Sequence, residues 1–140
     1  MTKLKNERLV ATLDFLTQVE LPPKASRVRT KLIKRLQVKI DELYKDEIEL
    51  LEKFGMKDEN GTLVQHEGSF SLVEATAETY HQEKQALLQE AISLDVAEIK
   101  DKFPILIETL ENSEVSYSGN QAELLDFILE QLENEMEEVK

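Results

Sequence analysis

The sequence predicts a mainly α protein: a long antiparallel helical hairpin with a small β-hairpin or short sheet at its tip and additional helices packed alongside. Charged residues make up 33% of the chain, hydrophobic residues 41% and aromatic residues only 6%, which is typical of helices with highly charged surfaces. An apolar stripe at helical spacing extends from Val28 to Phe54. Turn signals then interrupt the pattern over residues 57–73 before helical spacing returns. At 140 residues, a single domain over 1–140 is expected.

The first two predicted helices are bounded by start and stop signals. Asn6 is suited to cap a first helix, which residues 21–23 (Leu-Pro-Pro) bring to an end. A long helix is expected over about residues 24–54, and Gly55 is a favoured terminator after it. A helix of this length favours a hairpin or a bundle of long helices.

The second half of the chain begins with short strands and ends in helices. A turn is expected at residues 57–61, strands at 62–66 and 69–73, a helix at about 74–91, a short strand or extended crossover at 92–96, a helix from Pro104 to about Asn112, and a final helix at about 120–138.

Charge is divided unevenly along the chain. Residues 1–60 hold 13 basic and 11 acidic residues, a net +2, and residues 61–140 hold 4 and 18, a net -14, which together give -12. The first half contains a basic block (residues 24–39) without a single acidic residue, and this block has to neutralise acids of this protein or of a partner. Its members are Lys24, Arg27, Arg29, Lys31, Lys34, Arg35 and Lys39.

Three interpretations of the basic block stay open. It can be a solvated helix face that the protein's own acidic helices balance, above all the helix over residues 124–138. It can also be a contact surface for an acidic protein partner or for a second copy of this chain, so that a protein partner or self-association is expected. Nucleic-acid binding is the third interpretation, which the net negative charge and the lack of interleaved aromatic residues disfavour.

Three charged residues fall on the apolar side of the predicted helices when these are drawn at 100° per residue: Arg29, Glu47 and Lys84. If the helices that carry Glu47 and Lys84 pack antiparallel, the two side chains reach the same level. We predict an interhelical ion pair there, which would fix the register of the helices. Arg29 lies too far along the helix to join them and needs a separate acid. The candidates are Glu90, Asp95 and Glu98.

The sequence carries no catalytic or metal-binding motif. There are no cysteines, and His66 and His81 belong to no pattern of metal ligands or general bases. Residues 57–61 have the wrong ligand spacing for a calcium loop. We therefore expect no enzyme activity, no metal and no cofactor. The N-terminus is too polar for a signal peptide and no apolar run approaches the ~20 residues of a membrane helix, so we expect an intracellular protein without a membrane partner.

Several segments, taken in order, resemble a known family. The segment Lys24-Ala25-Ser26-Arg27-Val28-Arg29-Thr30-Lys31 follows Leu-Lys-Asn-x-x-Leu at residues 4–9 and precedes the Asp-Glu-Asn-Gly turn at residues 58–61 and Ile-Ser-Leu-Asp-Val at residues 92–96. This order resembles a family of small uncharacterised proteins, a domain of unknown function, encoded by phages and prophages of Gram-positive bacteria. The resemblance covers most of residues 3–112. It implies a phage origin and a location in the cytoplasm of the bacterial host or in the virion, and it supplies no catalytic residues.

These observations together predict a non-enzymatic phage or prophage accessory, assembly or protein-interaction protein. The alternative is a nucleic-acid-associated phage protein that uses the basic face of residues 24–39.

Overall fold

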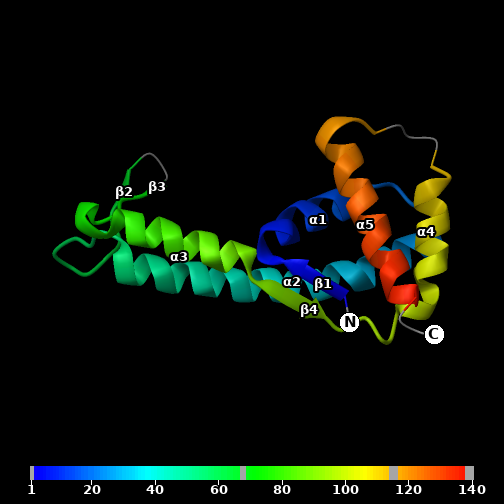
Figure 1. Cartoon of the computed structure of the whole chain (residues 1–140), viewed down its shortest axis with the longest axis horizontal. Helices are drawn as coiled ribbons and strands as arrows, with labels where there is room; N and C mark the ends of the chain where they lie inside the picture. The colour runs from blue at the N-terminus through cyan, green and yellow to red at the C-terminus, as the bar shows by residue number, and fades with distance from the viewer. Residues whose placement is uncertain (1, 67–68, 114–116, 138–140) are drawn as a thin grey trace. The chain divides into compact units, whose positions relative to one another are not determined.

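The chain forms two compact units (Figure 1). The computed structural model describes residues 2–66, 69–113 and 117–137. Unit 1 consists of Met1–Ile40 with Ala91–Lys140, and unit 2 consists of Asp41–Glu90. Helix α2 (Pro23–Phe54) contributes its first part to unit 1 and its last part to unit 2. That the whole chain 1–140 behaves as one domain stays a prediction.

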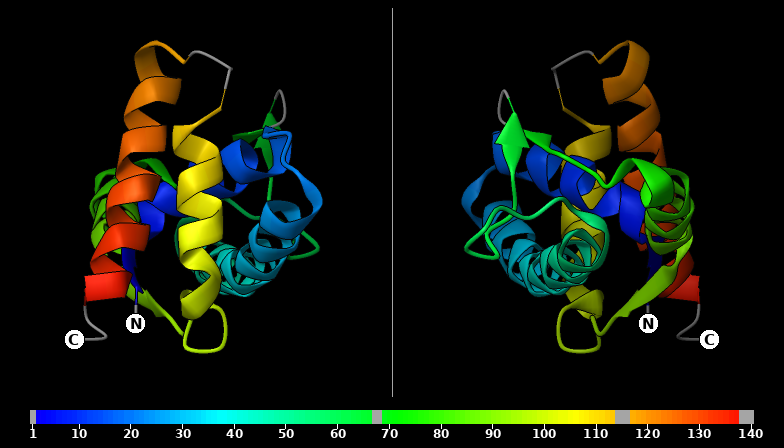
Figure 2. Two further views of the ribbon diagram at one scale, coloured as in Figure 1. Left: turned by 90° about the vertical axis from the view of Figure 1, so that its right-hand side faces the viewer. Right: turned by 90° about the vertical axis from the view of Figure 1, so that its left-hand side faces the viewer.

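Unit 1 is built mainly from helices. They are α1 (Asn6–Gln18), the first part of α2, α4 (Phe103–Glu111) and α5 (Gly119–Glu137). Helices α4 and α5 lie side by side and run in opposite directions (Figure 2), and α5 also packs against α1. Each helix buries apolar side chains at helical spacing, as the sequence predicts. The core contains Leu9 and Leu16 of α1, Leu32 and Leu36 of α2, Leu106 and Leu110 of α4, and Ile128 and Leu132 of α5.

A two-stranded antiparallel sheet completes unit 1. Strand β4 (Ala91–Leu94) lies close to the strand predicted at residues 92–96. Its partner, β1 (Thr2–Lys5), is unexpected from the sequence. Leu4 pairs with Ile92, and Leu4 is itself buried, so the sheet contributes to the core. Because β1 ends at Lys5, that residue occupies the N-cap position of α1, and Asn6 is a buried first helical residue rather than the predicted cap.

Unit 2 is the predicted antiparallel helical hairpin. The last part of α2 and α3 (Ala77–Gln89) form its two arms, and a short 3-10 turn (Glu74–Thr76) precedes α3. The arms are joined near the tip, because the N–H of Val73 donates to the carbonyl of Phe54 at 3.1 Å. The rings of Phe54 and Tyr80 meet edge to face with their centroids 6.3 Å apart. The sequence therefore predicts both the arms and their direction correctly.

The tip of unit 2 contains the predicted small β element, with shorter strands than expected. Strands β2 (Gln65–His66) and β3 (Ser69–Phe70) pair antiparallel. The turn at residues 57–61 is present: Asp58 Oδ1 accepts the N–H of Asn60 at 2.8 Å and that of Thr62 at 3.0 Å. An Asp side chain that bonds the backbone two residues ahead is a common turn device, which accounts for this segment without a calcium ion. Residues 67–68, which connect the two strands, lie outside the described residues.

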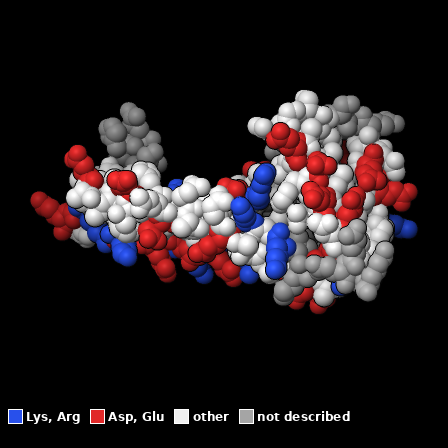
Figure 3. Space-filling view, viewed as in Figure 1, with Lys and Arg blue, Asp and Glu red and all other residues white. Residues whose placement is uncertain are grey.

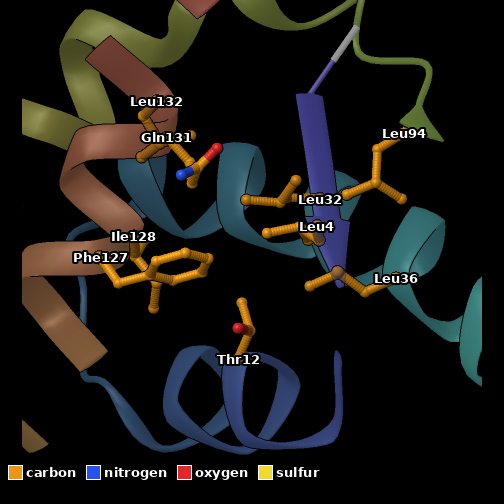
Figure 4. A pocket seen from close by; sticks show the side chains of 9 residues that line it. All are labelled: Leu4, Thr12, Leu32, Leu36, Leu94, Phe127, Ile128, Gln131 and Leu132. Atoms are coloured by element: carbon orange, nitrogen blue, oxygen red, sulfur yellow. The ribbon is translucent and has the colours of Figure 1, made fainter. Parts of the chain in front are cut away.

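The core of unit 1 contains a small cavity with one unsatisfied hydroxyl (Figure 4). Its volume is about 30 Å³, and its lining is almost entirely apolar. Thr12 Oγ1 is buried there without a hydrogen-bond partner in the described part of the chain. A buried hydroxyl without a partner loses its hydration and gains nothing in return. The cavity lies among Leu4, Thr12, Leu32, Leu36, Leu94, Phe127, Ile128, Gln131 and Leu132.

We expect Thr12→Val to stabilise the protein by about 1 kcal/mol, because valine keeps the shape of threonine and removes the unsatisfied hydroxyl. Chemical denaturation followed by circular dichroism measures the effect. Thr17→Val is the matched control, because Thr17 is exposed and its hydroxyl donates to Leu13 O at 2.8 Å; this variant should gain nothing. A loss of stability in Thr12→Val would contradict the assignment of an unsatisfied group.

Candidate anion-binding cleft

The structure divides the basic block by giving some of its members internal partners. Arg29 is half-buried, and its Nη1 donates to the carbonyl oxygens of Leu16, at 3.4 Å, and Val19. Its Nη2 donates to Ser26 Oγ at 2.9 Å. Leu16 and Val19 lie at the end of α1, where carbonyls lack helical partners and carry the negative end of the helix dipole. Arg29 thus caps the C-terminus of α1.

The prediction that an acid (Glu90, Asp95 or Glu98) pairs with Arg29 is wrong. Its guanidinium donates to backbone carbonyls instead. Two of those candidates serve Arg35 instead. Arg35 Nε donates to the carbonyl of Asp95 at 2.9 Å, and Nη2 pairs with Glu98 Oε2 at 3.3 Å. Arg35 therefore ties α2 to the segment that follows β4.

Three other members of the block line a cleft in unit 1. Lys24, Arg27 and Lys31 lie at positions i, i+3 and i+7 of α2, a spacing that places them on one helix face. Lys102, immediately before α4, contributes a fourth cation. The cleft has a volume of about 240 Å³. Its apolar lining comes from Val28, which is buried, and Ile105, which is 39% exposed.

All the charged side chains that line this cleft are cationic. Among the residues that the structure describes, no acidic one lines it. Within residues 2–66, 69–113 and 117–137, no hydrogen bond or ion pair engages the side chains of Lys24, Arg27, Lys31 or Lys102. Helix α2 begins at Pro23, so its dipole adds positive potential at this end. The cleft can therefore hold carboxylate or phosphate groups, with Ile105 available for an apolar contact.

The other sequence-predicted site residues lie outside the cleft. Lys34 is exposed on α2, and Lys39 is half-buried with a partner. Glu47 and Lys84 are both half-buried in unit 2, and the structure records no ion pair between them among the described residues. Lys84 Nζ lies instead 6.0 Å from the centre of the Tyr80 ring, a cation–π arrangement. The Glu47–Lys84 pair stays a prediction.

Two lining residues were missed by sequence reasoning. Lys102 and Ile105 are about 70 positions away from the basic block, and nothing in their local pattern indicates a site. In the described ranges, no group of three or more His, Asp or Glu side chains is placed to hold a metal ion. None of the described helices combines the length and apolarity that a membrane crossing requires.

The fold and the cleft define a small, mainly helical protein with a groove that four cationic side chains line. Comparison with known families gives its relationship. The family described as Protein of unknown function (DUF1617) matches residues 2–138, and the chain belongs to this family. No curated protein and no solved structure is found to match the chain.

Proposed function

We propose that this chain is a non-enzymatic phage or prophage accessory or assembly protein that works through protein contacts, and that the cleft binds an acidic segment of a protein partner. The observation that supports this is the division of the basic block. Arg29 and Arg35 are used inside unit 1, whereas Lys24, Arg27 and Lys31 surround a groove without an acid. The four cations around the groove, which have no partner among the described residues, repel each other, and an anionic ligand relieves that repulsion.

An acidic peptide fits the cleft better than a nucleic acid does. Acidic side chains crowd the face over α4 and α5 (Figure 3), and the whole chain carries -12, so a long polyanion is repelled beyond the cleft. In the described part of the chain, no aromatic side chain lines the cleft to stack a base. Ile105 offers an apolar contact that suits a peptide side chain next to a carboxylate.

Nucleic acid is the second candidate, supported by the row of cations at i, i+3 and i+7 on α2, which can follow phosphates. The two candidates differ in their salt dependence and in their ligand. A phosphate backbone releases condensed counterions, so its binding falls steeply between about 50 mM and about 200 mM salt. A short peptide with alternating Glu and Leu loses less affinity over this range, since it also makes apolar contacts.

The test is fluorescence anisotropy with three labelled probes: the Glu-Leu peptide, a DNA duplex and a single-stranded RNA. We expect the peptide to bind, and Arg27→Glu or Lys31→Glu to weaken binding by at least about tenfold, because each replaces a charge-assisted contact by repulsion. Lys34→Glu is the matched control, since it makes the same charge change on the same helix outside the cleft.

Binding of the DNA or RNA probe in preference to the peptide would replace the leading proposal by the second candidate. Equal losses in Lys34→Glu and Arg27→Glu would show that overall charge, and not the cleft, governs binding.

A further inference from the structure

Unit 1 contains another pocket, which lies between the end of α1 and the start of α5. We call it the α1–α5 pocket; its described lining consists of Phe15, Gln18, Val19, Glu20, Tyr117 and Gln121. Its volume is about 260 Å³, just below the roughly 300 Å³ at which pockets begin to hold drug-sized ligands. The pocket therefore suits a ligand the size of a single ring. It shares no lining residue with the cationic cleft, so its ligand is independent of what the cleft binds.

One wall of the α1–α5 pocket is an aromatic pair. Phe15 is 3% exposed, and its ring centroid lies 5.5 Å from that of Tyr117, with the two planes tilted by 50°. Tyr117 is half-buried, so Phe15 supports it from the core side while part of the Tyr117 ring faces the pocket. An aromatic ring that is held in place by packing offers a fixed apolar face to a ligand.

The rim of the pocket is polar and carries both hydrogen-bond donors and acceptors. Gln18 and Gln121 each offer an amide N–H and an amide oxygen, Glu20 offers a carboxylate, and Tyr117 offers a hydroxyl. The side chains of Gln18, Glu20 and Gln121 are exposed. Throughout residues 2–66, 69–113 and 117–137, no hydrogen bond or ion pair engages these three side chains or the Tyr117 hydroxyl. Their hydrogen-bonding capacity is therefore available to a ligand.

The charges around the pocket favour a neutral ligand. Glu20 repels an anion, and it is the only charged side chain in the described lining. A cation is disfavoured by Arg29, because its Nη1 donates to the carbonyl of Val19, the residue before Glu20. A wholly apolar ligand would cover the polar rim without bonding it, which costs free energy. A neutral ring with several hydroxyl groups and an apolar face meets none of these obstacles.

We propose that the α1–α5 pocket binds one pyranose ring of a carbohydrate. The C–H face of the sugar stacks on Tyr117, its hydroxyl groups donate to Glu20, and they exchange hydrogen bonds with the amides of Gln18 and Gln121. A hydroxyl and a side-chain amide can each donate and accept, so neighbouring hydroxyls pair with these amides without leaving a group unsatisfied. The same chemistry is offered by a free monosaccharide and by a sugar of a longer glycan.

The first test is a titration of the full chain with sugars, followed by NMR. The probes are methyl β-glucopyranoside, methyl β-galactopyranoside and N-acetylglucosamine. We expect at least one of them to shift the side-chain amide signals of Gln18 and Gln121. The amides of Gln82 and Gln85 should not respond, because they line a hollow on α3 whose described lining contains neither Phe nor Tyr.

Glucitol is the matched control among the ligands, since it carries the hydroxyl groups of glucose on an open chain. Without a ring face to stack on Tyr117, it should bind at least about fivefold more weakly than the best pyranose. A trisaccharide of that pyranose distinguishes the two sources, because only a site for a longer glycan binds it more tightly than the single sugar. Unmoved Gln18 and Gln121 signals with every pyranose, or tighter binding of arginine amide or acetate, overturn the proposal.

The second test uses variants in the pocket. Tyr117→Ala should raise the dissociation constant by at least about tenfold, because it removes the ring face, whereas Tyr117→Phe keeps the ring and should cost about threefold. Gln121→Ala changes only an exposed side chain, so it tests the site even if Tyr117→Ala fails to fold, and it should also cost about threefold. Asn120→Ala is its matched control, since Asn120 is an exposed amide on the same helix outside the pocket lining. Equal losses in Asn120→Ala and Gln121→Ala, or unchanged binding by a folded Tyr117→Ala variant, contradict the proposed site.

Discussion

Replacing Arg29 by methionine should lower the free energy of unfolding of unit 1 by about 2 kcal/mol. The variant keeps the apolar stem but removes the donors that serve Leu16 O, Val19 O and Ser26 Oγ. Both carbonyls lie at the end of α1, where no helical N–H replaces a lost donor. The loss is limited because Arg29 Nε, which is buried without a partner in the described residues, is removed as well.

Urea denaturation together with hydrogen exchange followed by NMR for individual amides would measure this effect. The exchange of the Val19 N–H, which donates to Phe15 O at 3.2 Å, should accelerate because it closes the turn that Arg29 holds. Unit 2, residues 41–90, should keep its exchange rates if the units open separately.

Arg27→Met is the matched control for Arg29→Met, because both remove one arginine from the same block. Arg27 is exposed and makes no hydrogen bond in the described part of the chain, so the change should stay within about 0.5 kcal/mol. Arg29→Lys should recover only part of the loss, since one ammonium cannot span the acceptors that the planar fork reaches. Equal stabilities of the Arg29→Met and Arg27→Met variants would rule out the capping role.

The sequence predicts the helices of this fold well and its β1–β4 sheet poorly, for a physical reason. A helical stripe such as that from Val28 to Phe54 consists of apolar residues three and four positions apart, so it can be recognised from a short stretch of sequence. Strand β1 is only four residues long and finds its partner about 90 positions later, where Leu4 pairs with Ile92. A short polar segment does not indicate which distant strand it will meet, so only β4 could be anticipated.

The candidate site shows the same limit. The basic block is visible as composition, and helical placement singles out Arg29 as an inward-facing charge. The partners of Arg29 could not be predicted, because only acidic side chains were considered as acceptors. The acceptors in the structure are two backbone carbonyls, and every residue of the chain has one. Likewise Lys102 joins the cleft only through the packing of α4 beside α2. Charge position is predictable from a helical pattern, but charge partners depend on tertiary contacts.

Gly55→Ala should destabilise unit 2 by about 2 kcal/mol, within the range found for overpacked sites. The sequence explains Gly55 as a terminator of α2, and the structure adds a steric requirement. A Cβ there would lie 2.6 Å from the backbone oxygen of Leu51 and 2.7 Å from Leu63 Cδ2. Leu63 can rotate, but the Leu51 carbonyl is held, since it accepts the N–H of Gly55 at 2.6 Å. The backbone must therefore shift where α2 enters the tip.

Gly61→Ala is the control that distinguishes the steric clash at Gly55 from the cost of replacing any glycine by alanine. Gly61 has φ of 79°, and a Cβ added there would meet no atom within 4 Å, so alanine costs only the left-handed conformation, about 1 kcal/mol. In Gly55→Ala/Leu63→Ala, removal of the Leu63 clash should make the combined loss smaller than the sum of the single losses. Exchange of the Met56 N–H, which donates to Ser71 O at 2.7 Å, reports the shift directly. Additive losses in the double variant would leave the Leu51 oxygen as the sole cause of the strain, whereas an unchanged Met56 exchange rate would show that the tip absorbs the methyl group without moving.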